Sequence, residues 1–264
     1  MHGGSVCVPG APGVRPIFAA GIRRSLLSLL VLLFAGSPAV AICVDAATLA
    51  HSTVSITRYF AGKDSKANSN LLGIRGTAWF LSATSIVTVE HVATAMELSD
   101  RNWKQVDVLE GENKQSIDVR ILRLAGLHSE KIAVLELRTA FSGAHALQMR
   151  MEPLAPEERV VSLAYPGSRL SLVGGRFVQY GDSDKFAGTA LLEMYDGDNR
   201  LVLDHGASGA PVLDCQGRVV AVVSNLFTQT MQFLSNAIRI STAWGQANVA
   251  SVPIQVLKDY LKDK

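Results

Sequence analysis

Short apolar segments, separated by polar turns, run through most of the chain after residue 50. The segment 52–59 alternates in polarity and is rich in β-branched residues, as is typical of a half-buried strand. Many short strands with frequent turns predict an all-β sandwich or barrel. The expected strands cover 52–59, 73–81, 85–89, 105–109, 116–122, 132–137, 159–164, 170–180, 187–195, 211–213, 218–226 and 233–240.

The end of the chain has a different period. Within 251–261, Ile254, Leu257 and Leu261 fall on one face at helical spacing, and Pro253 suits a first helical turn. This pattern predicts a short C-terminal helix.

The first 41 residues have the composition of a secretory signal peptide. Arg23 and Arg24 precede the apolar run 25–35, and small residues follow up to Ala41. The run is short for a membrane-spanning helix. We therefore predict cleavage after Ala41, export to the periplasm or the medium, and no membrane contact afterwards. An uncleaved membrane anchor is the alternative.

The charge balance gives no sign of a nucleic-acid partner. The full chain has 25 basic and 23 acidic residues, and removal of residues 1–41 takes away three arginines and no acid. The rest lacks a basic stripe with stacking aromatic residues. No group of residues has the spacing of a metal site, so neither a metal nor another cofactor is expected.

A turn of small residues surrounds one serine, in the sequence Gly206-Ala207-Ser208-Gly209-Ala210-Pro211. A nucleophile needs a turn that projects its side chain and lets backbone N–H groups converge on one point. Gly206 and Gly209 lack a Cβ and can adopt the dihedral angles that such a turn requires. An ordinary surface turn is the alternative, since short motifs match by chance.

A candidate base lies upstream, where two expected strands lead into Glu90-His91-Val92. No histidine follows Ser208, which excludes the α/β-hydrolase order of serine before histidine. A histidine that precedes the serine fits the chymotrypsin order.

These two motifs resemble those of the trypsin/chymotrypsin-like serine proteases, especially the exported bacterial heat-shock branch. That branch has Gly-Thr-Gly-Phe, then Thr-x-x-His-Val, then Gly-x-Ser-Gly-x-Pro, and this chain departs from it at Ala78, Val89, Glu90 and Ala210. The resemblance implies an all-β fold of two six-stranded antiparallel β-barrels with a short C-terminal helix. Residues 42–150 would form the barrel with His91, and 151–264 the barrel with Ser208 and the helix, without a PDZ domain.

In this family an acid forms a catalytic triad with the serine and the histidine, and the sequence leaves the identity of that acid open. In the family an aspartate opens the strand Asp-Leu/Ile-Ala-Val-Leu, and Lys131 occupies that position here. A lysine would disfavour the imidazolium that the acid stabilises. Glu130, one residue earlier, is the leading candidate. The alternatives are another acid (Asp100, Asp107 or Asp118), a His–Ser dyad, or an inactive site.

The resemblance also implies the other parts of the site. The N–H groups of Gly206 and Ser208 would hold the oxyanion, while Val202, Ser224 and Asn225 would line the primary specificity pocket. Val202 falls where a preference for Lys or Arg needs an acid, so an apolar or small side chain is expected in the pocket. His205 is expected to line the site, and His51, His128 and His145 to be solvated.

Cysteine usage fits export. Cys7 leaves with the signal peptide, and Cys43 and Cys215 remain as an even pair. We predict a disulfide between them, with two unpaired thiols as the alternative.

The sequence thus predicts an exported serine endopeptidase that acts on polypeptides through Ser208, with His91 as general base. The alternative, motivated by Lys131, is a catalytically impaired pseudoprotease that serves as a peptide-binding or scaffold module. An esterase-type hydrolase on the same site is a third possibility. No segment of the sequence indicates an oligomeric state.

Overall fold

The computed structural model describes residues 43–62, 64, 66, 72–128, 130–181, 187–196, 203, 205–224 and 247–262. The chain divides into two units, Met1–Ala39 and Val40–Lys264, and every described residue belongs to the second. The predicted signal peptide therefore lies outside the described residues. Within the described part, no helix is long and apolar enough to cross a membrane.

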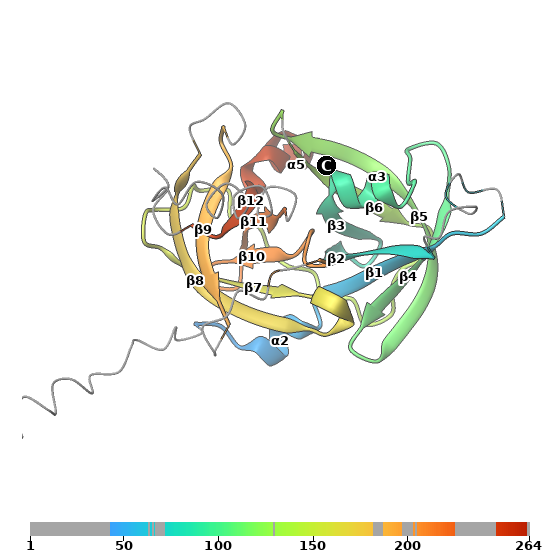
Figure 1. Ribbon diagram of the computed structural model, residues 1–264, viewed down its shortest axis with the longest axis horizontal. Helices are drawn as coiled ribbons and strands as arrows, with labels where there is room; N and C mark the ends of the chain where they lie inside the picture. Colours follow the sequence, from blue (N-terminus) through green and yellow to red (C-terminus); the bar gives the residue numbers. More distant parts are fainter. Residues whose placement is uncertain are drawn as a thin grey trace, which may run out of the picture. The chain divides into compact units, whose positions relative to one another are not determined.

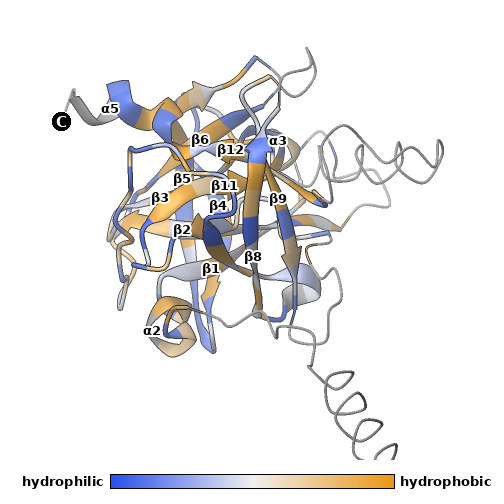
Figure 2. Ribbon diagram, turned by 90° about the vertical axis from the view of Figure 1, so that its left-hand side faces the viewer, coloured by the Kyte–Doolittle hydropathy of each residue, from blue (hydrophilic) through white to orange (hydrophobic). Residues whose placement is uncertain are grey.

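The first barrel is a closed antiparallel sheet of six strands in the order β1-β2-β3-β6-β5-β4 (Figure 1). All five residues of β3 are buried, and this strand is coloured as hydrophobic in Figure 2. The closed sheet leaves no exposed edge. The strands are β1 (Thr53–Tyr59), β2 (Gly73–Ser82), β3 (Ser85–Val89), β4 (Lys104–Glu110), β5 (Asn113–Gly126) and β6 (Lys131–Leu137).

The second barrel is also closed and antiparallel, in the order β10-β11-β12-β9-β8-β7. Its strands are β7 (Arg159–Ala164), β8 (Ser171–Tyr180), β9 (Ala190–Tyr195), β10 (Pro211–Leu213), β11 (Val219–Val223) and β12 (Val249–Pro253). A 3-10 turn, η1 (Pro166–Ser168), joins β7 to β8. The predicted architecture of two six-stranded barrels is confirmed.

The two barrels share a hydrophobic core. One cluster of buried residues fills the first barrel and continues into the second through Leu163, Val222 and Ile254. A separate cluster around Phe177 and Leu192 fills the second barrel. The shared core fixes the two barrels against each other, which is the condition for a site made of residues from both.

The end of the chain differs in part from the sequence prediction. Residues 251–253, predicted to begin a helix, belong to β12, which pairs antiparallel with β9 and β11. The prediction was wrong there because barrel closure decides the conformation of so short a segment. The predicted helix follows as η2 (Ile254–Leu257) and α5 (Lys258–Lys262). The strand predicted at 233–240 lies outside the described residues.

An N-terminal arm, residues 43–51, leads into β1 and contains the helix α2 (Ala46–Ala50). Asp45 caps this helix by accepting a hydrogen bond from Ala47 N at 3.0 Å. Cys43 and Cys215 form a disulfide, with their Cα atoms 5.2 Å apart. The predicted disulfide is therefore present, and it ties the arm to the turn between β10 and β11.

Candidate active site

His91 lies in the first turn of α3 (Glu90–Ala95), which begins directly after β3. Val92 and Ala93 are buried and anchor this turn on the first barrel. The His91 side chain keeps 30% of its surface exposed. The buried strand therefore holds the backbone, while the imidazole ring reaches the surface between the barrels.

Ser208 lies in the turn just before β10 and is only 6% exposed. Both flanking glycines have positive φ, +96° at Gly206 and +93° at Gly209. A Cβ on Gly209 would stand 2.0 Å from Thr77 O, so only glycine fits there. Ser208 Oγ is 3.0 Å from His91 Nε2, which is hydrogen-bond distance.

Glu130 lies directly before β6, with its carboxylate next to the His91 ring. Its Oε2 is 2.6 Å from His91 Nδ1 and accepts a hydrogen bond from Ser224 Oγ at 3.0 Å. Its Oε1 accepts from Lys131 N at 3.2 Å. Glu130 is 3% exposed, so these donors replace the water that a carboxylate would otherwise bind.

The contact between Glu130 Oε2 and His91 Nδ1 suits one imidazole tautomer. An ionised carboxylate at Glu130 can only accept, and its partner is then Nδ1–H. The lone pair of Nε2 then faces the Ser208 hydroxyl, which is the tautomer a general base requires.

Lys131 does not share the surroundings of Glu130. Its Nζ is 3.1 Å from Glu90 Oε1, and this ion pair is partly exposed. The Lys131 charge therefore has an acidic partner of its own in Glu90.

The other acids that the sequence left open have different partners or positions. Asp107 pairs with Lys114 at 2.7 Å, and Asp118 pairs with Arg138 at 2.9 Å. Asp100 is exposed in the loop before β4. Among these candidates, Glu130 is the one that the structure brings to His91.

The backbone of the serine turn has a defined orientation. The carbonyl of His205 accepts from Gly167 N at 3.4 Å, and that of Ala207 accepts from Ala210 N at 3.0 Å. Within a planar trans peptide the N–H points opposite to the C=O. The N–H groups of Gly206 and Ser208 therefore point away from those two donors.

The residues expected in the specificity pocket are only partly described. Ser224 is buried directly after β11, and its hydroxyl donates to Glu130, a contact that the sequence did not predict. Val202 and Asn225 lie outside the described residues.

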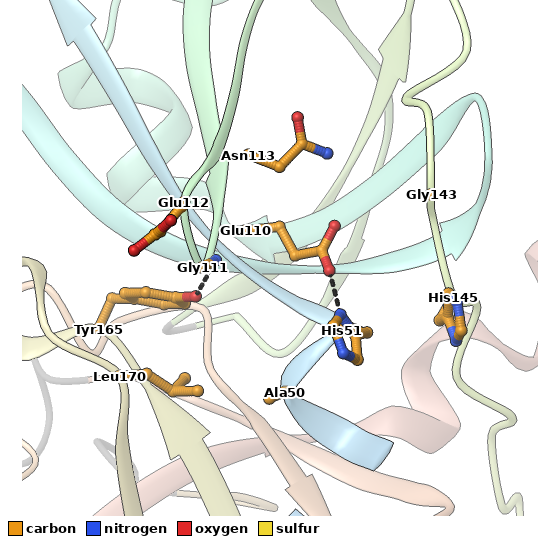
Figure 3. Close-up of a pocket in the computed structure, with 10 residues that line it drawn as sticks. All are labelled: Ala50, His51, Glu110, Gly111, Glu112, Asn113, Gly143, His145, Tyr165 and Leu170. Carbon is orange, nitrogen blue, oxygen red and sulfur yellow. Dashed lines mark hydrogen bonds and ion pairs between the residues drawn. The ribbon is translucent and has the colours of Figure 1, made fainter. Parts of the chain in front are cut away.

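His205 is exposed within the serine turn, and His128 is exposed after β5. The prediction that His51 is simply solvated is incomplete. Its Nδ1 pairs with Glu110, a residue only 8% exposed, and its ring lies 5.6 Å from that of His145. These side chains, with Tyr165, line a cavity of about 440 Å³ beside the N-terminal arm (Figure 3).

The Tyr165 hydroxyl accepts a hydrogen bond from Gly111 N at 3.2 Å. Burial, opposed by this bond and reinforced by the charge of Glu110, raises the pKa of the Tyr165 phenol. Within the described ranges, no group of three His, Cys, Asp or Glu side chains could hold a metal ion.

Two closed six-stranded barrels with a serine, a histidine and an acid between them define a chymotrypsin-like fold. The family model for the trypsin-like peptidase domain matches residues 76–222, more than half of the chain. The chain therefore belongs to the trypsin-like peptidase family, and that membership supports a protease function.

Solved structures agree on the fold. The Rv3671c protease from M. tuberculosis is similar in its inactive form, with a TM-score of 0.53 and 17% identity over 86% of this chain and 95% of that one. Its active form gives a TM-score of 0.53 and 16% identity over 87% and 91% of the two chains. An inactive serine-to-alanine mutant gives a TM-score of 0.54 and 16% identity over 86% and 94%. No curated protein sequence matches the chain. The assignment to the heat-shock branch stays a prediction.

Proposed function

We propose that this protein is an exported serine endopeptidase, with Ser208 as nucleophile, His91 as general base and Glu130 as the third member of its triad. The observation that carries the proposal is the continuous row Ser208 Oγ, His91 Nε2, His91 Nδ1 and Glu130 Oε2, with contacts of 3.0 and 2.6 Å. A nucleophile, a base and a group that orients the base within hydrogen-bond reach are the signature of an activated serine.

The reaction follows from these positions. Ser208 Oγ attacks the carbonyl carbon of a peptide bond while its proton passes to His91 Nε2. The tetrahedral oxyanion accepts hydrogen bonds from the N–H groups of Gly206 and Ser208. The C–N bond then breaks as His91 gives its proton to the leaving amine. Water, deprotonated by His91, attacks the acyl-enzyme and releases the acid and free Ser208.

Glu130 has two tasks in this mechanism. It holds the imidazole in the tautomer that leaves Nε2 available as a base, and its charge stabilises the imidazolium that forms. The hydrogen bond from Ser224 and that from Lys131 N hold the carboxylate in place. We therefore assign Ser224 the role of orienting Glu130.

Export is part of the proposal. The apolar N-terminal run predicts a signal peptide, and the Cys43–Cys215 disulfide is typical of an oxidising compartment. N-terminal sequencing of the protein from the cell envelope or the medium should find Ile42 as the first residue. A full-length protein retained in the cytoplasm would contradict export.

The pseudoprotease alternative was motivated by Lys131. Lys131 pairs with Glu90, and Glu130 contacts His91. The lysine at the usual acid position is therefore not by itself a reason to expect an inactive site.

The first test is covalent labelling of the purified protein, without residues 1–41, by a fluorophosphonate probe. Such a probe reports an activated serine whatever the natural substrate is. Labelling of the wild type, but not of Ser208→Ala or His91→Ala, would support the mechanism. Cleavage of an unfolded polypeptide by the same samples then separates a peptidase from an esterase. A folded wild type that does not react would overturn the proposal.

A further inference from the structure

Thr77, in β2 of the first barrel, contacts the serine turn of the second barrel at two points. Its hydroxyl Oγ1 donates to Gly206 O at 2.7 Å, and its backbone N donates to Ser208 O at 2.9 Å. Thr77 is fully buried. One residue of the first barrel therefore holds the carbonyls of both residues whose N–H groups are proposed to bind the oxyanion.

A third contact fixes the direction of the Thr77 hydroxyl proton. Tyr165 N donates to Thr77 Oγ1 at 3.0 Å. A backbone N–H can only donate, so Thr77 must accept there and is left to donate its own proton to Gly206 O. Both functions of the hydroxyl are used, and its removal would leave a buried donor and a buried acceptor without partners.

Gly206 needs such an external restraint more than its neighbours do. It has no side chain, its φ is +96°, and glycine loses more conformational freedom on ordering than any other residue. Its own N–H is one of the two proposed oxyanion donors, so rotation about its φ and ψ would turn that N–H relative to the N–H of Ser208. The Thr77 hydroxyl restrains that rotation through the Gly206 carbonyl.

We infer that Thr77 is a positioning residue for the oxyanion hole, which it preorganises by holding the Gly206 carbonyl through its side-chain hydroxyl. The inference rests on the proposed function, because it assumes that the Gly206 and Ser208 N–H groups stabilise an oxyanion. Thr77 acts through Gly206 and touches no reacting atom. Its contribution therefore belongs to the transition state rather than to binding of the substrate.

The test compares Thr77→Val, which keeps the shape and removes the hydroxyl, with Thr77→Ser, which keeps the hydroxyl. Saturation kinetics of fluorophosphonate labelling give the maximal rate kinact and the half-saturation constant KI. We expect Thr77→Val to lower kinact about 10- to 100-fold, less than the loss of a whole oxyanion donor, with KI unchanged. Thr77→Ser should stay within about threefold of the wild type. The pH dependence of labelling should not change in either variant, because His91 and Glu130 are intact.

Thr53→Val is the matched control. Thr53 is also fully buried in the first barrel, but its hydroxyl has no hydrogen-bond partner among the described residues. This variant should label like the wild type. If Thr77→Val does not fold, Thr77→Ala replaces it, because alanine also lacks the hydroxyl and does not add the second methyl group of valine. This variant is assayed at a temperature at which its thermal unfolding curve shows that it is folded.

The possible outcomes distinguish a failure of the Thr77 inference from a failure of the proposed protease function. A folded Thr77→Val, or its alanine substitute, with wild-type kinact would overturn this inference alone. An equal loss of kinact in Thr77→Val and Thr77→Ser would also overturn it, since packing and not the hydroxyl would then matter. A folded wild type without any labelling would overturn the proposed function, and this inference with it.

Discussion

Glu130 and Lys131 are adjacent in sequence, yet their charged groups have different partners. The Glu130 carboxylate lies 2.6 Å from His91 Nδ1, whereas Lys131 Nζ lies 3.1 Å from Glu90 Oε1. Successive residues of an extended strand point in opposite directions. An acid at position 130, one residue before the usual position, can therefore contact His91 although the usual position holds Lys131.

Substitutions of Glu130 and of Lys131 should have very different effects on activity. Glu130→Gln keeps the size of the side chain and removes the charge that stabilises the imidazolium. We expect the rate of Ser208 labelling to fall by about 10²- to 10⁴-fold. Lys131→Gln should change it by less than about threefold, because its ion pair is partly exposed. Glu130→Gln with wild-type labelling would exclude Glu130 from the triad.

The glycine after the nucleophile predicts a difference in stability between two similar substitutions. In Gly209→Ala the new Cβ would stand 2.0 Å from Thr77 O and 2.2 Å from Thr88 Oγ1. The clash and the positive φ together should cost more than about 3 kcal/mol of unfolding free energy. Gly217→Ala is the control, since its φ is also positive but its nearest neighbour, Leu49 Cδ2, is 3.6 Å away. It should cost about 1 kcal/mol in urea denaturation. Equal losses in the two variants would contradict this account.

The disulfide predicts a dependence of stability on redox conditions. Cys43 and Cys215 are 172 residues apart, so the bond closes a long loop in the unfolded chain. Reduction, or the double change Cys43→Ser and Cys215→Ser, should lower the free energy of unfolding by about 2–5 kcal/mol. Thermal unfolding with and without reductant measures the effect. The double variant should not respond to reductant, and an identical response of both proteins would mean that the bond does not form.

Asp64 predicts a loss of stability in acid. Its carboxylate accepts from Ala61 N at 3.0 Å and pairs with Lys104 and the buried Arg58, and these contacts lower its pKa from 3.8 to about 2 against the cost of burial. A carboxyl group whose pKa is depressed by folding stabilises the fold above its unfolded pKa. This contribution is therefore complete above about pH 4 and is lost as the pH falls towards 2.

The measurement is the free energy of unfolding of the wild type and of Asp64→Asn between pH 6 and pH 2. We expect the wild type to be more stable at pH 6 by about 1–2 kcal/mol, with the difference shrinking to near zero at pH 2. A difference that stays constant over this range would show that Asp64 does not titrate with a depressed pKa. Other carboxyl groups titrate in both proteins and cancel in the comparison.

Local sequence determined much of this protein. Period-two alternation and frequent turns predicted an all-β sandwich or barrel, because each strand buries one face whatever its partner is. The His91 and Ser208 motifs and their order pointed to one class of site, since the nucleophile turn requires small residues at fixed positions. The resemblance then led from these two anchors to two six-stranded barrels.

Only the tertiary structure decided the contacts between segments far apart in the chain. The sequence made Glu130 the leading candidate but left Asp100, Asp107 and Asp118 open, and of these four barrel closure brings Glu130 to His91. The same holds for Ser224 with Glu130, His51 with Glu110, and Thr77 with Gly206. The strand at 249–253 exists because β9 and β11 flank it. Contacts between residues 39 to 129 positions apart leave no local pattern, because they depend on how the strands close into barrels and how the barrels pack, and not on either segment alone.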